Sequence, residues 1–383
     1  MNRRDFLSAT AASSVLAWLP QPALAAVDYR KLLILIELKG GNDGLNTVIP
    51  YADAQYAALR PRIAVARDQV LQLDEFTGLN PSLSSLMPLW KAGELGVVQG
   101  VGYPAGNLSH FRSIEIWETA SKSNEYLQEG WLTRAFDQSP VPRTYAADAV
   151  VVGSPEVGPF AGHGTRTIAL TNTEQFLQQA RLAVGAGQAH NAALSHILRV
   201  ENDIVQAAAN LNTNHVFRTA FPQTGFGNAV RTASQVIASK AGVAALKLSL
   251  NGFDTHSGQT GTHTNLLKTL ADGLAALKAA LSELGRWDDT LITTYAEFGR
   301  RPRENASGGT DHGTANAHFV LGGAVKGGLY GARPAFDRLD GNGNLPFAVD
   351  FRSIYATVLE RWWGVSAVAA LRGRFTTLDV LKA

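Results

Sequence analysis

Acidic side chains follow three apolar runs in this sequence, at the points where buried strands are expected to end. Asp43 lies in a glycine-rich turn after the first run, Asp254 follows the second and Glu297 the third. The runs are residues 31–38, 244–250 and 290–296. A fourth acid, Asp311, comes later and is followed directly by His312. Since ligands bind at the carboxyl ends of strands in open α/β sheets, we expect these acids to share one site.

Five of the nine histidines lie inside or beside the same motifs, namely His110, His256, His263, His312 and His318. Imidazole nitrogens and carboxylate oxygens together suit zinc and other divalent metals. The predicted ligands are Asp43, Asp254, His256, Glu297, Asp311, His312 and His318, with His110, His263 and Asn42 as further candidates. The alternative for Asp43 is a turn aspartate that bonds its own backbone.

Ser109 opens a predicted helix and is the candidate nucleophile. The start of a helix favours negative charge, and a nearby metal would activate a hydroxyl further. The competing interpretation is a simple helix cap. Arg112, in the same turn, either clamps a phosphate or sulfate through two parallel hydrogen bonds or pairs with Glu115 or Glu118.

Composition excludes several classes of protein. The chain has 383 residues, no cysteine and a net charge of +2. Thiolate zinc sites, cysteine nucleophiles and disulfides are therefore excluded. The small charge is no footprint for nucleic acid or an anionic membrane.

The first 26 residues have the pattern of a twin-arginine export signal. Arg3 and Arg4 precede a weakly apolar stretch, and Ala23-Leu24-Ala25 provides a small-x-small cleavage site. The stretch is too short and too polar for a lasting membrane span. We therefore expect a periplasmic or secreted protein that has the twin-arginine translocation machinery as its partner and keeps no stable span after cleavage.

Strands and helices alternate along the rest of the chain. This order predicts an α/β fold with a mostly parallel central sheet and helices on both faces. The predicted strands are 31–38, 95–101, 149–152, 166–170, 244–250 and 290–296. The predicted helices are 52–59, 81–92, 109–121, 173–183, 189–211, 228–240, 263–284 and 350–363. Residues 27–383 are expected to form one domain with a helical insertion at about 173–240. Residues 300–310 are expected to form a loop whose arginines, Arg300, Arg301 and Arg303, are either a solvated basic surface or a rim that attracts anions.

Several motifs together resemble the family named domain of unknown function 1501, which is placed in the alkaline phosphatase and sulfatase superfamily. They are GGNDGLNTVIPY (40–51), VVQGVGYP (97–104), NLSHFRS (107–113), GFDTH (252–256), EFGRRP (297–302) and DHGTANAHF (311–319). The resemblance implies an alkaline phosphatase-like fold with one or two divalent ions, of Zn, Mn, Mg or Ca. It also implies hydrolysis or transfer of phosphate or sulfate esters by a hydroxyl nucleophile.

By position, the resemblance makes Asp43, Asp254 and His256 metal ligands, with Asp311, His312 and His318 completing the second site, and Ser109 the nucleophile. Two departures leave alternatives open. Only Thr255 separates Asp254 from His256, so His263 is an alternative ligand. Glu297 occupies the position directly after a strand, so either Glu297 or Asp311 is the direct ligand.

The leading expectation is therefore an exported metal-dependent hydrolase of a small phosphate or sulfate ester. One alternative is a non-catalytic exported protein that uses the same fold for metal binding or surface assembly. A second is a phosphotransferase or phosphomutase, which differs only in the acceptor.

Overall fold

The computed structural model describes residues 27–170, 215–239 and 242–382. Its central feature is one large sheet. Its strands lie side by side in the order β13 (Gly328–Gly331), β5 (Leu95–Gly102), β12 (Asn316–Leu321), β9 (Thr290–Tyr295), β1 (Leu32–Lys39), β8 (Val243–Asn251), β6 (Ala147–Val152) and β7 (Thr167–Leu170), and β14 (Val349–Asp350) also pairs with β5. Every described pairing in this sheet is parallel except those of β12 with β5 and β9. The predicted mostly parallel sheet is confirmed.

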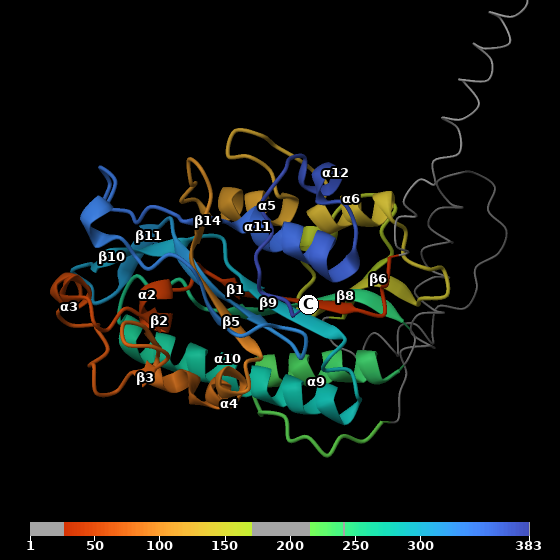
Figure 1. Cartoon of the computed structure of the whole chain (residues 1–383), viewed down its shortest axis with the longest axis horizontal. Helices are drawn as coiled ribbons and strands as arrows, with labels where there is room; N and C mark the ends of the chain where they lie inside the picture. Colours follow the sequence, from red (N-terminus) through yellow and green to blue (C-terminus); the bar gives the residue numbers. More distant parts are fainter. Residues whose placement is uncertain (1–26, 171–214, 240–241, 383) are drawn as a thin grey trace, which may run out of the picture.

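Helices cover both faces of this sheet, as Figure 1 shows. On one face lie α5 (His110–Thr119), α6 (Trp131–Gln138), α11 (Phe351–Ala356), η5 (Thr357–Trp363) and α12 (Ala367–Leu371). On the other lie η2 (Pro81–Leu86), α4 (Met87–Lys91), α9 (Gly225–Ala238) and α10 (Gln259–Glu283). The short elements are α2 (Gly44–Thr47), α3 (Ala54–Leu59), η3 (Gly158–Phe160) and η4 (Phe336–Arg338).

The apolar run of β1 explains why the sheet has two covered faces. Successive side chains of a strand point to opposite faces. Leu33 and Leu35 belong to the core beneath α5 and α6, whereas Ile34 and Ile36 belong to the core beneath α9 and α10. All four are at most 1% exposed. A strand that is buried on both faces must lie in the middle of the sheet, and β1 pairs on both sides, with β8 and β9.

Two antiparallel elements lie beside the large sheet. A small sheet joins β2 (Val48–Ile49), β4 (Gly78–Leu79) and β3 (Leu71–Gln72). A hairpin joins β10 (Gly299–Glu304) to β11 (Thr310–Gly313), and Arg300 faces His312 across it. The prediction of a solvated loop over 300–310 is therefore wrong. Although its side chains are polar, the backbone of the segment pairs in an antiparallel ribbon.

Two sequence predictions fall partly or wholly on residues that the structure does not describe. The export signal, residues 1–26, lies outside the described part, as do the predicted helices 173–183 and 189–211. The last segment of the expected insertion is described as α9, and its Phe226, Val230 and Ala233 lie in the core beneath the sheet. No helix in the described ranges combines the length and the apolar character that crossing a membrane requires.

Candidate metal centre and active site

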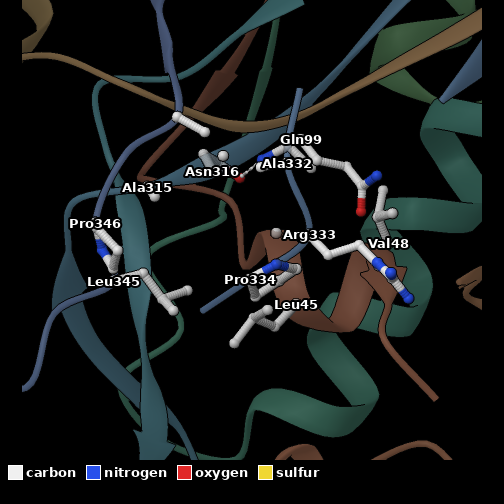
Figure 2. A pocket seen from close by; sticks show the side chains of 14 residues that line it. Leu45, Val48, Gln99, Ala315, Asn316, Ala332, Arg333, Pro334, Leu345 and Pro346 are labelled. Carbon is white, nitrogen blue, oxygen red and sulfur yellow. Dashed lines mark hydrogen bonds between the residues drawn. The ribbon is translucent and has the colours of Figure 1, made fainter. Parts of the chain in front are cut away.

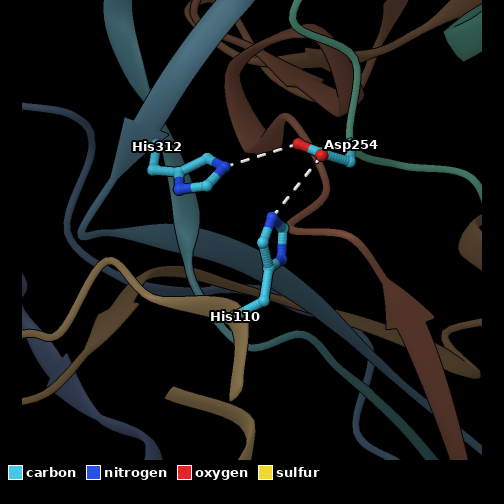
Figure 3. A group of neighbouring side chains, drawn as sticks. All are labelled: His110, Asp254 and His312. Atoms are coloured by element: carbon cyan, nitrogen blue, oxygen red, sulfur yellow. Dashed lines mark hydrogen bonds and ion pairs between the residues drawn. The ribbon is translucent and has the colours of Figure 1, made fainter. Parts of the chain in front are cut away.

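Three side chains with metal-binding atoms, those of His110, Asp254 and His312, converge at one edge of the sheet, and His256 contacts two of them. Asp254 and His256 follow β8, His110 is the first residue of α5 after β5, and His312 lies on β11. Ligand atoms of His110, Asp254 and His312 all lie within 4.8 Å of one another (Figure 3). The convergence of Asp254 and His312, expected from the sequence, is thus observed, and His110 joins them.

His256 brings a further nitrogen to this group. Its Nε2 lies 2.9 Å from Nε2 of His312 and 3.2 Å from Oδ1 of Asp254, and the His312 nitrogen lies 3.4 Å from the same oxygen. Atoms bound about 2.0–2.1 Å from one zinc ion lie about 2.9 Å apart at a right angle and about 3.4 Å apart at a tetrahedral angle. The three separations therefore fit ligands of a single ion.

Each imidazole is oriented through its other nitrogen. Nδ1 of His110 lies 2.9 Å from Oε1 of Glu297, Nδ1 of His312 lies 2.8 Å from the carbonyl oxygen of Leu108, and Nδ1 of His256 lies 3.5 Å from Oδ1 of Asp311. Partners of this kind fix the ring and leave the lone pair of Nε2 directed at the site. The donor set and its orientation fit a divalent metal.

Glu297 and Asp311 are therefore placed as orienting partners and not among the atoms that converge. Glu297 is 2% exposed, and its Oε1 also accepts a hydrogen bond from the backbone N–H of Gly40 at 2.9 Å. Asp311 accepts from Nδ2 of Asn305 at 3.1 Å. The expectation that Asp311 is a direct ligand does not match this geometry, because its carboxylate lies on the far nitrogen of His256.

The charges of the site suit metal binding at neutral pH. Burial alone would raise the pKa of Asp254, but the hydrogen bond and charge of Arg300 hold it below its ordinary value. The hydrogen bond from Asn305 lowers the pKa of Asp311, and burial lowers that of His312. The carboxylates are therefore ionised and His312 is neutral, which is the state that metal ligands require.

Arg300 organises the site, a role that its sequence context does not reveal. Its side chain is 2% exposed. The guanidinium donates to the carbonyl oxygens of Gly40, Gly41, Phe253 and Thr310 and to Oδ1 of Asp254, the last at 2.8 Å. It thereby joins the loops after β1 and β8 to the hairpin. The one sequence feature that could have indicated this role is the position of Arg300, three residues after Glu297 and close to the end of a predicted strand.

Phe298 packs between two of the candidate ligands. Its ring centroid lies 4.9 Å from that of His110 and 4.3 Å from that of His312. The rings of His110 and His312 themselves meet edge to face at 4.5 Å. Packing on Phe298 therefore restricts the rotation that the hydrogen bonds alone would allow.

Ser109 lies at the N-cap position of α5, next to His110, and is exposed. Its backbone is extended, with φ −85° and ψ 127°, but its side chain makes no capping hydrogen bond. The backbone N–H of Ser109 donates to Oδ1 of Asn107 at 2.9 Å. The hydroxyl is therefore not committed to the helix.

An ion cluster beneath α5 fixes the helix that carries Ser109 and His110. Nζ of Lys247 lies 3.1 Å from Oε2 of Glu37 and 3.0 Å from Oε1 of Glu118. Lys247 and Glu37 are 0% exposed and extend from neighbouring strands, whereas Glu118 is on α5. Because a buried charge without its partner costs several kcal/mol, about 3–5 by mutation, this contact ties the helix to the sheet.

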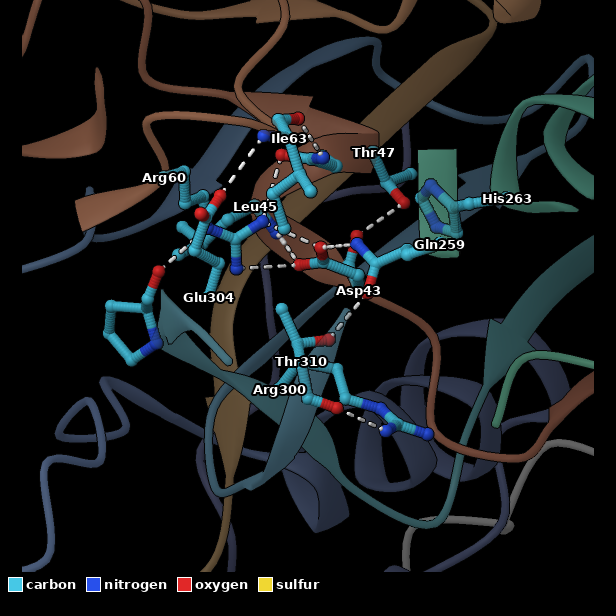
Figure 4. Close-up of polar contacts among 12 residues, drawn as sticks. Asp43, Leu45, Thr47, Arg60, Ile63, Gln259, His263, Arg300, Glu304 and Thr310 are labelled. Atoms are coloured by element: carbon cyan, nitrogen blue, oxygen red, sulfur yellow. Dashed lines mark hydrogen bonds and ion pairs between the residues drawn. The ribbon is translucent and has the colours of Figure 1, made fainter. Parts of the chain in front are cut away.

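Asp43, predicted to be a ligand, has other partners. It caps α2 and forms an ion pair with Arg60, in which Nη1 lies 2.6 Å from Oδ2 (Figure 4). Asn42 and His263 contact each other, with Nε2 of His263 2.9 Å from Oδ1 of Asn42. His263 is 2% exposed, and burial lowers its pKa to about 4. These three residues form a buried support behind the site instead of part of the open cluster.

The prediction that His318 converges with the other ligands is wrong. His318 lies within β12, is 0% exposed and packs edge-on against Trp117 at 5.2 Å. Burial lowers its pKa to about 3. Its Nε2 has no hydrogen-bond partner among the described residues. The sequence could not show this, because β12, an antiparallel strand, was not predicted.

Arg112 does not point at the cluster. Its guanidinium pairs with Oε1 of Glu115 at 2.7 Å and donates to the carbonyl oxygens of Lys122, Ser123 and Glu125. It also lies 3.9 Å from the ring centre of Tyr126. Of the two sequence interpretations, pairing with Glu115 is confirmed and the anion clamp is wrong.

The sequence matches a family described as a protein of unknown function, DUF1501, over residues 81–370. The chain belongs to this family. The matched range contains His110, Asp254, His256 and His312. No curated protein matches the sequence.

Several solved structures resemble the chain at low sequence identity. The structure of Ps i-CgsB has a TM-score of 0.43 and 12% identity, with 90% of this chain and 75% of that one covered. A protein in the alkaline phosphatase superfamily from Vibrio parahaemolyticus has a TM-score of 0.41 and 12% identity, with coverage of 98% and 78%. The PsFucS1 sulfatase from Pseudoalteromonas sp. has a TM-score of 0.41 and 11% identity, with coverage of 91% and 70%.

The cluster lies on an open surface and not in an enclosed cavity. The side chains of Asp254 and His256 are 47% and 44% exposed. A small cavity of about 30 Å³ lies beside α2, between Leu45, Gln99 and Leu345 (Figure 2). None of the four candidate ligands lines it. The candidate ligands are therefore accessible from solvent.

Proposed function

We propose that the protein is a metal-dependent hydrolase of phosphate or sulfate esters, with Ser109 as nucleophile. The observation that carries the proposal is the convergence of His110, Asp254 and His312, with His256 in contact with the last two. Ser109 precedes His110 directly in the sequence, and its hydroxyl makes no capping hydrogen bond. A nucleophilic displacement needs a nucleophile and a group that activates it. The free hydroxyl would be the nucleophile, and a metal held by the neighbouring ligands would activate it.

The donor set favours zinc among the four candidate metals. Imidazole nitrogens together with a carboxylate oxygen are typical zinc ligands. Calcium and magnesium prefer oxygen ligands throughout, and so fit this group less well. A bound zinc ion would supply Lewis-acid activation of the ester and of the hydroxyl.

Each residue of the site would then have its own role in the reaction. Oγ of Ser109 would lose its proton as it forms the new bond to phosphorus or sulfur, while the ester oxygen would leave with the bonding electrons and take up a proton. Water would then cleave the seryl ester and restore the hydroxyl. The N-terminus of α5 favours the negative charge that develops on Oγ. Glu297 and Asp311 keep the imidazoles oriented throughout, and Arg300 holds Asp254 in place.

A non-catalytic metal-binding protein is the second candidate, and the placement of Arg112 favours it. An ester hydrolase needs positive charge near the transferred group, and this arginine is committed to Glu115 and to backbone carbonyls. A protein that only binds metal has no such need.

We also propose that the protein is exported through the twin-arginine route. Arg3-Arg4 and the Ala23-Leu24-Ala25 site support this proposal. That machinery carries folded proteins, so a chain that takes up its metal before export would arrive with the site complete. The partner during export is the translocation machinery, and the substrate afterwards is a small ester.

Turnover of aryl phosphates, phosphodiesters and aryl sulfates, with Zn, Mn, Mg or Ca supplied, tests the enzyme proposal. Ser109→Ala should abolish activity on every ester that the wild type cleaves and should leave metal content unchanged. Ser366→Ala is a matched control, because Ser366 also lies exposed at an N-cap without a side-chain capping bond. A wild type that binds metal but cleaves none of the panel would favour the non-catalytic candidate.

A further inference from the structure

The carboxylate of Asp43 is fully engaged within the protein. Oδ1 accepts hydrogen bonds from the backbone N–H of Leu45 at 3.2 Å and from Nη2 of Arg60 at 3.0 Å. Oδ2 accepts from Nη1 of Arg60 at 2.6 Å and from Nε2 of Gln259. An ionised carboxylate has about four lone-pair sites, and four donors fill them. Asp43 is 0% exposed.

The guanidinium of Arg60 is equally committed. Besides its two bonds to Asp43, it donates from Nε to the carbonyl oxygen of Pro302 at 2.7 Å, from Nη2 to that of Arg301 at 3.1 Å and from Nη1 to Oδ1 of Asn46 at 2.8 Å. An arginine side chain has five N–H donors, and all five are used. Arg60 is 0% exposed, so the pair is closed to water on both sides (Figure 4).

Gln259 links the Asp43–Arg60 pair to the segments that carry the candidate ligands. While its Nε2 donates to Asp43, its Oε1 accepts from Oγ1 of Thr310 at 2.6 Å and from Oγ1 of Thr255 at 3.1 Å. Thr310 precedes Asp311, and Thr255 lies between Asp254 and His256. A metal ion at Asp43 would have to displace donors that also hold these two segments.

Asp254 shows the contrast between a saturated and an available carboxylate. Its side chain is 47% exposed, and its neighbours other than Arg300 are the nitrogens of His110, His256 and His312. Those nitrogens are metal ligands by chemistry, whereas the donors around Asp43 are amide and guanidinium N–H groups, which cannot ligate a metal.

We propose that each chain binds one divalent ion and that the guanidinium of Arg60 permanently neutralises Asp43, the acid that the family resemblance assigns to a metal. This inference rests on the proposed metal centre. The function of the Asp43–Arg60 pair is then to hold α2 and β10 together, with the backbone carbonyls of Arg301 and Pro302 as the points of attachment. The single ion belongs to the open cluster of Asp254 and the histidines.

The test is a count of zinc ions per full-length chain after saturation and removal of excess metal, measured by mass spectrometry and by calorimetric titration with zinc alone. We expect one ion in the wild type and one in Asp43→Asn. Asp254→Asn should lose most of the zinc and serves as the positive control. Because Asp43→Asn leaves Arg60 buried without its charge partner, it will also unfold at a lower temperature.

A second variant guards against failure of the first to fold. Asp43→Leu combined with Arg60→Met replaces both charges by apolar groups, a change that is often tolerated for buried ion pairs. It should also retain one ion. Two ions in the wild type, or loss of zinc from either Asp43 variant with native circular dichroism, would overturn the inference and leave the proposed function standing. A wild type that binds no zinc would overturn both, and that result is distinguishable from a count of two.

Discussion

Oε1 of Glu297 lies 2.9 Å from Nδ1 of His110 and accepts a second hydrogen bond from the backbone N–H of Gly40 at the same distance. This one oxygen therefore joins the ends of β9 and β1 to the first turn of α5. The other oxygen, Oε2, is buried without a hydrogen-bond partner among the described residues. Glu297 therefore orients His110, one of the candidate ligands.

Glu297→Gln should therefore weaken metal binding without abolishing it. Loss of an outer carboxylate partner typically lowers metal affinity about 10–100-fold. The amide keeps an oxygen for the N–H of Gly40 but loses the negative charge beside His110. Zinc affinity measured by competition with a chelator checks this. The control is Glu115→Gln, which changes a glutamate on α5, the helix that carries His110. Equal affinities for the wild type and Glu297→Gln would contradict the role given to Glu297.

Arg300→Ala should destabilise the protein by about 3 kcal/mol, because the buried carbonyl oxygens of Gly40 and Gly41 lose the guanidinium donor. Arg303→Ala is the matched control, since Arg303 lies on the same strand and is exposed. Exposed substitutions usually change stability by less than about 0.5 kcal/mol. The free energy of unfolding in urea distinguishes the two variants. Similar losses in both would mean that Arg300 does not organise the loops.

His318 should make the fold sensitive to acid. Its pKa is about 3 in the folded protein, and an unfolded chain has a value near about 6.5. Between these values the unfolded state binds a proton that the folded state does not, so stability falls as the pH falls through this window, by about 1.4 kcal/mol per pH unit.

His318→Leu should remove that contribution. The stability of the variant relative to the wild type should rise by about 2 kcal/mol between pH 7 and pH 5, as measured by urea unfolding at each pH. His163→Asn, at an exposed position, should leave the pH dependence unchanged. Parallel stability curves for the wild type and His318→Leu would show that His318 is not held neutral in the fold.

Changing Arg3 and Arg4 to lysine together should stop export, because the signal is read as an arginine pair. Fractionation of cells that express the wild type or the double variant measures this. The control combines Arg30→Lys with Lys31→Arg, since these two basic residues are also adjacent but belong to the mature chain. Undiminished arrival of the Arg3/Arg4 variant through the same route would disprove the export proposal.

The sequence predicted the elements with strong apolar runs and missed those without them. β1, β8 and β9 were predicted to within a residue or two, since each is a continuous run of buried side chains. The hairpin β10–β11 was predicted to be a loop because its strands are polar and contain Pro302 and Gly313. Pairing between such strands is set by contacts with distant segments, which local patterns do not record.

The site was predictable to the same extent. Residues placed directly after predicted strands, such as Asp254 and His256, do converge. Roles within the group were not predictable, because they depend on partners elsewhere in the chain. Asp43 is held by Arg60 from α3's C-cap, and His318 is enclosed by an unpredicted strand. From motif position alone, Asp43 and His318 are predicted to be metal ligands just as Asp254 and His312 are.

The pairing of Arg300 with His312 across the hairpin has a consequence for the order of assembly. His312 reaches the other ligands only when the hairpin has docked, and docking requires the carbonyl oxygens that Arg300 engages after β1 and β8. These contacts join segments far apart in the chain, and contacts of that kind form late because long loops must close first. A nascent or partly folded chain therefore lacks the complete set of candidate ligands, and uptake of the proposed ion would have to wait until folding has finished.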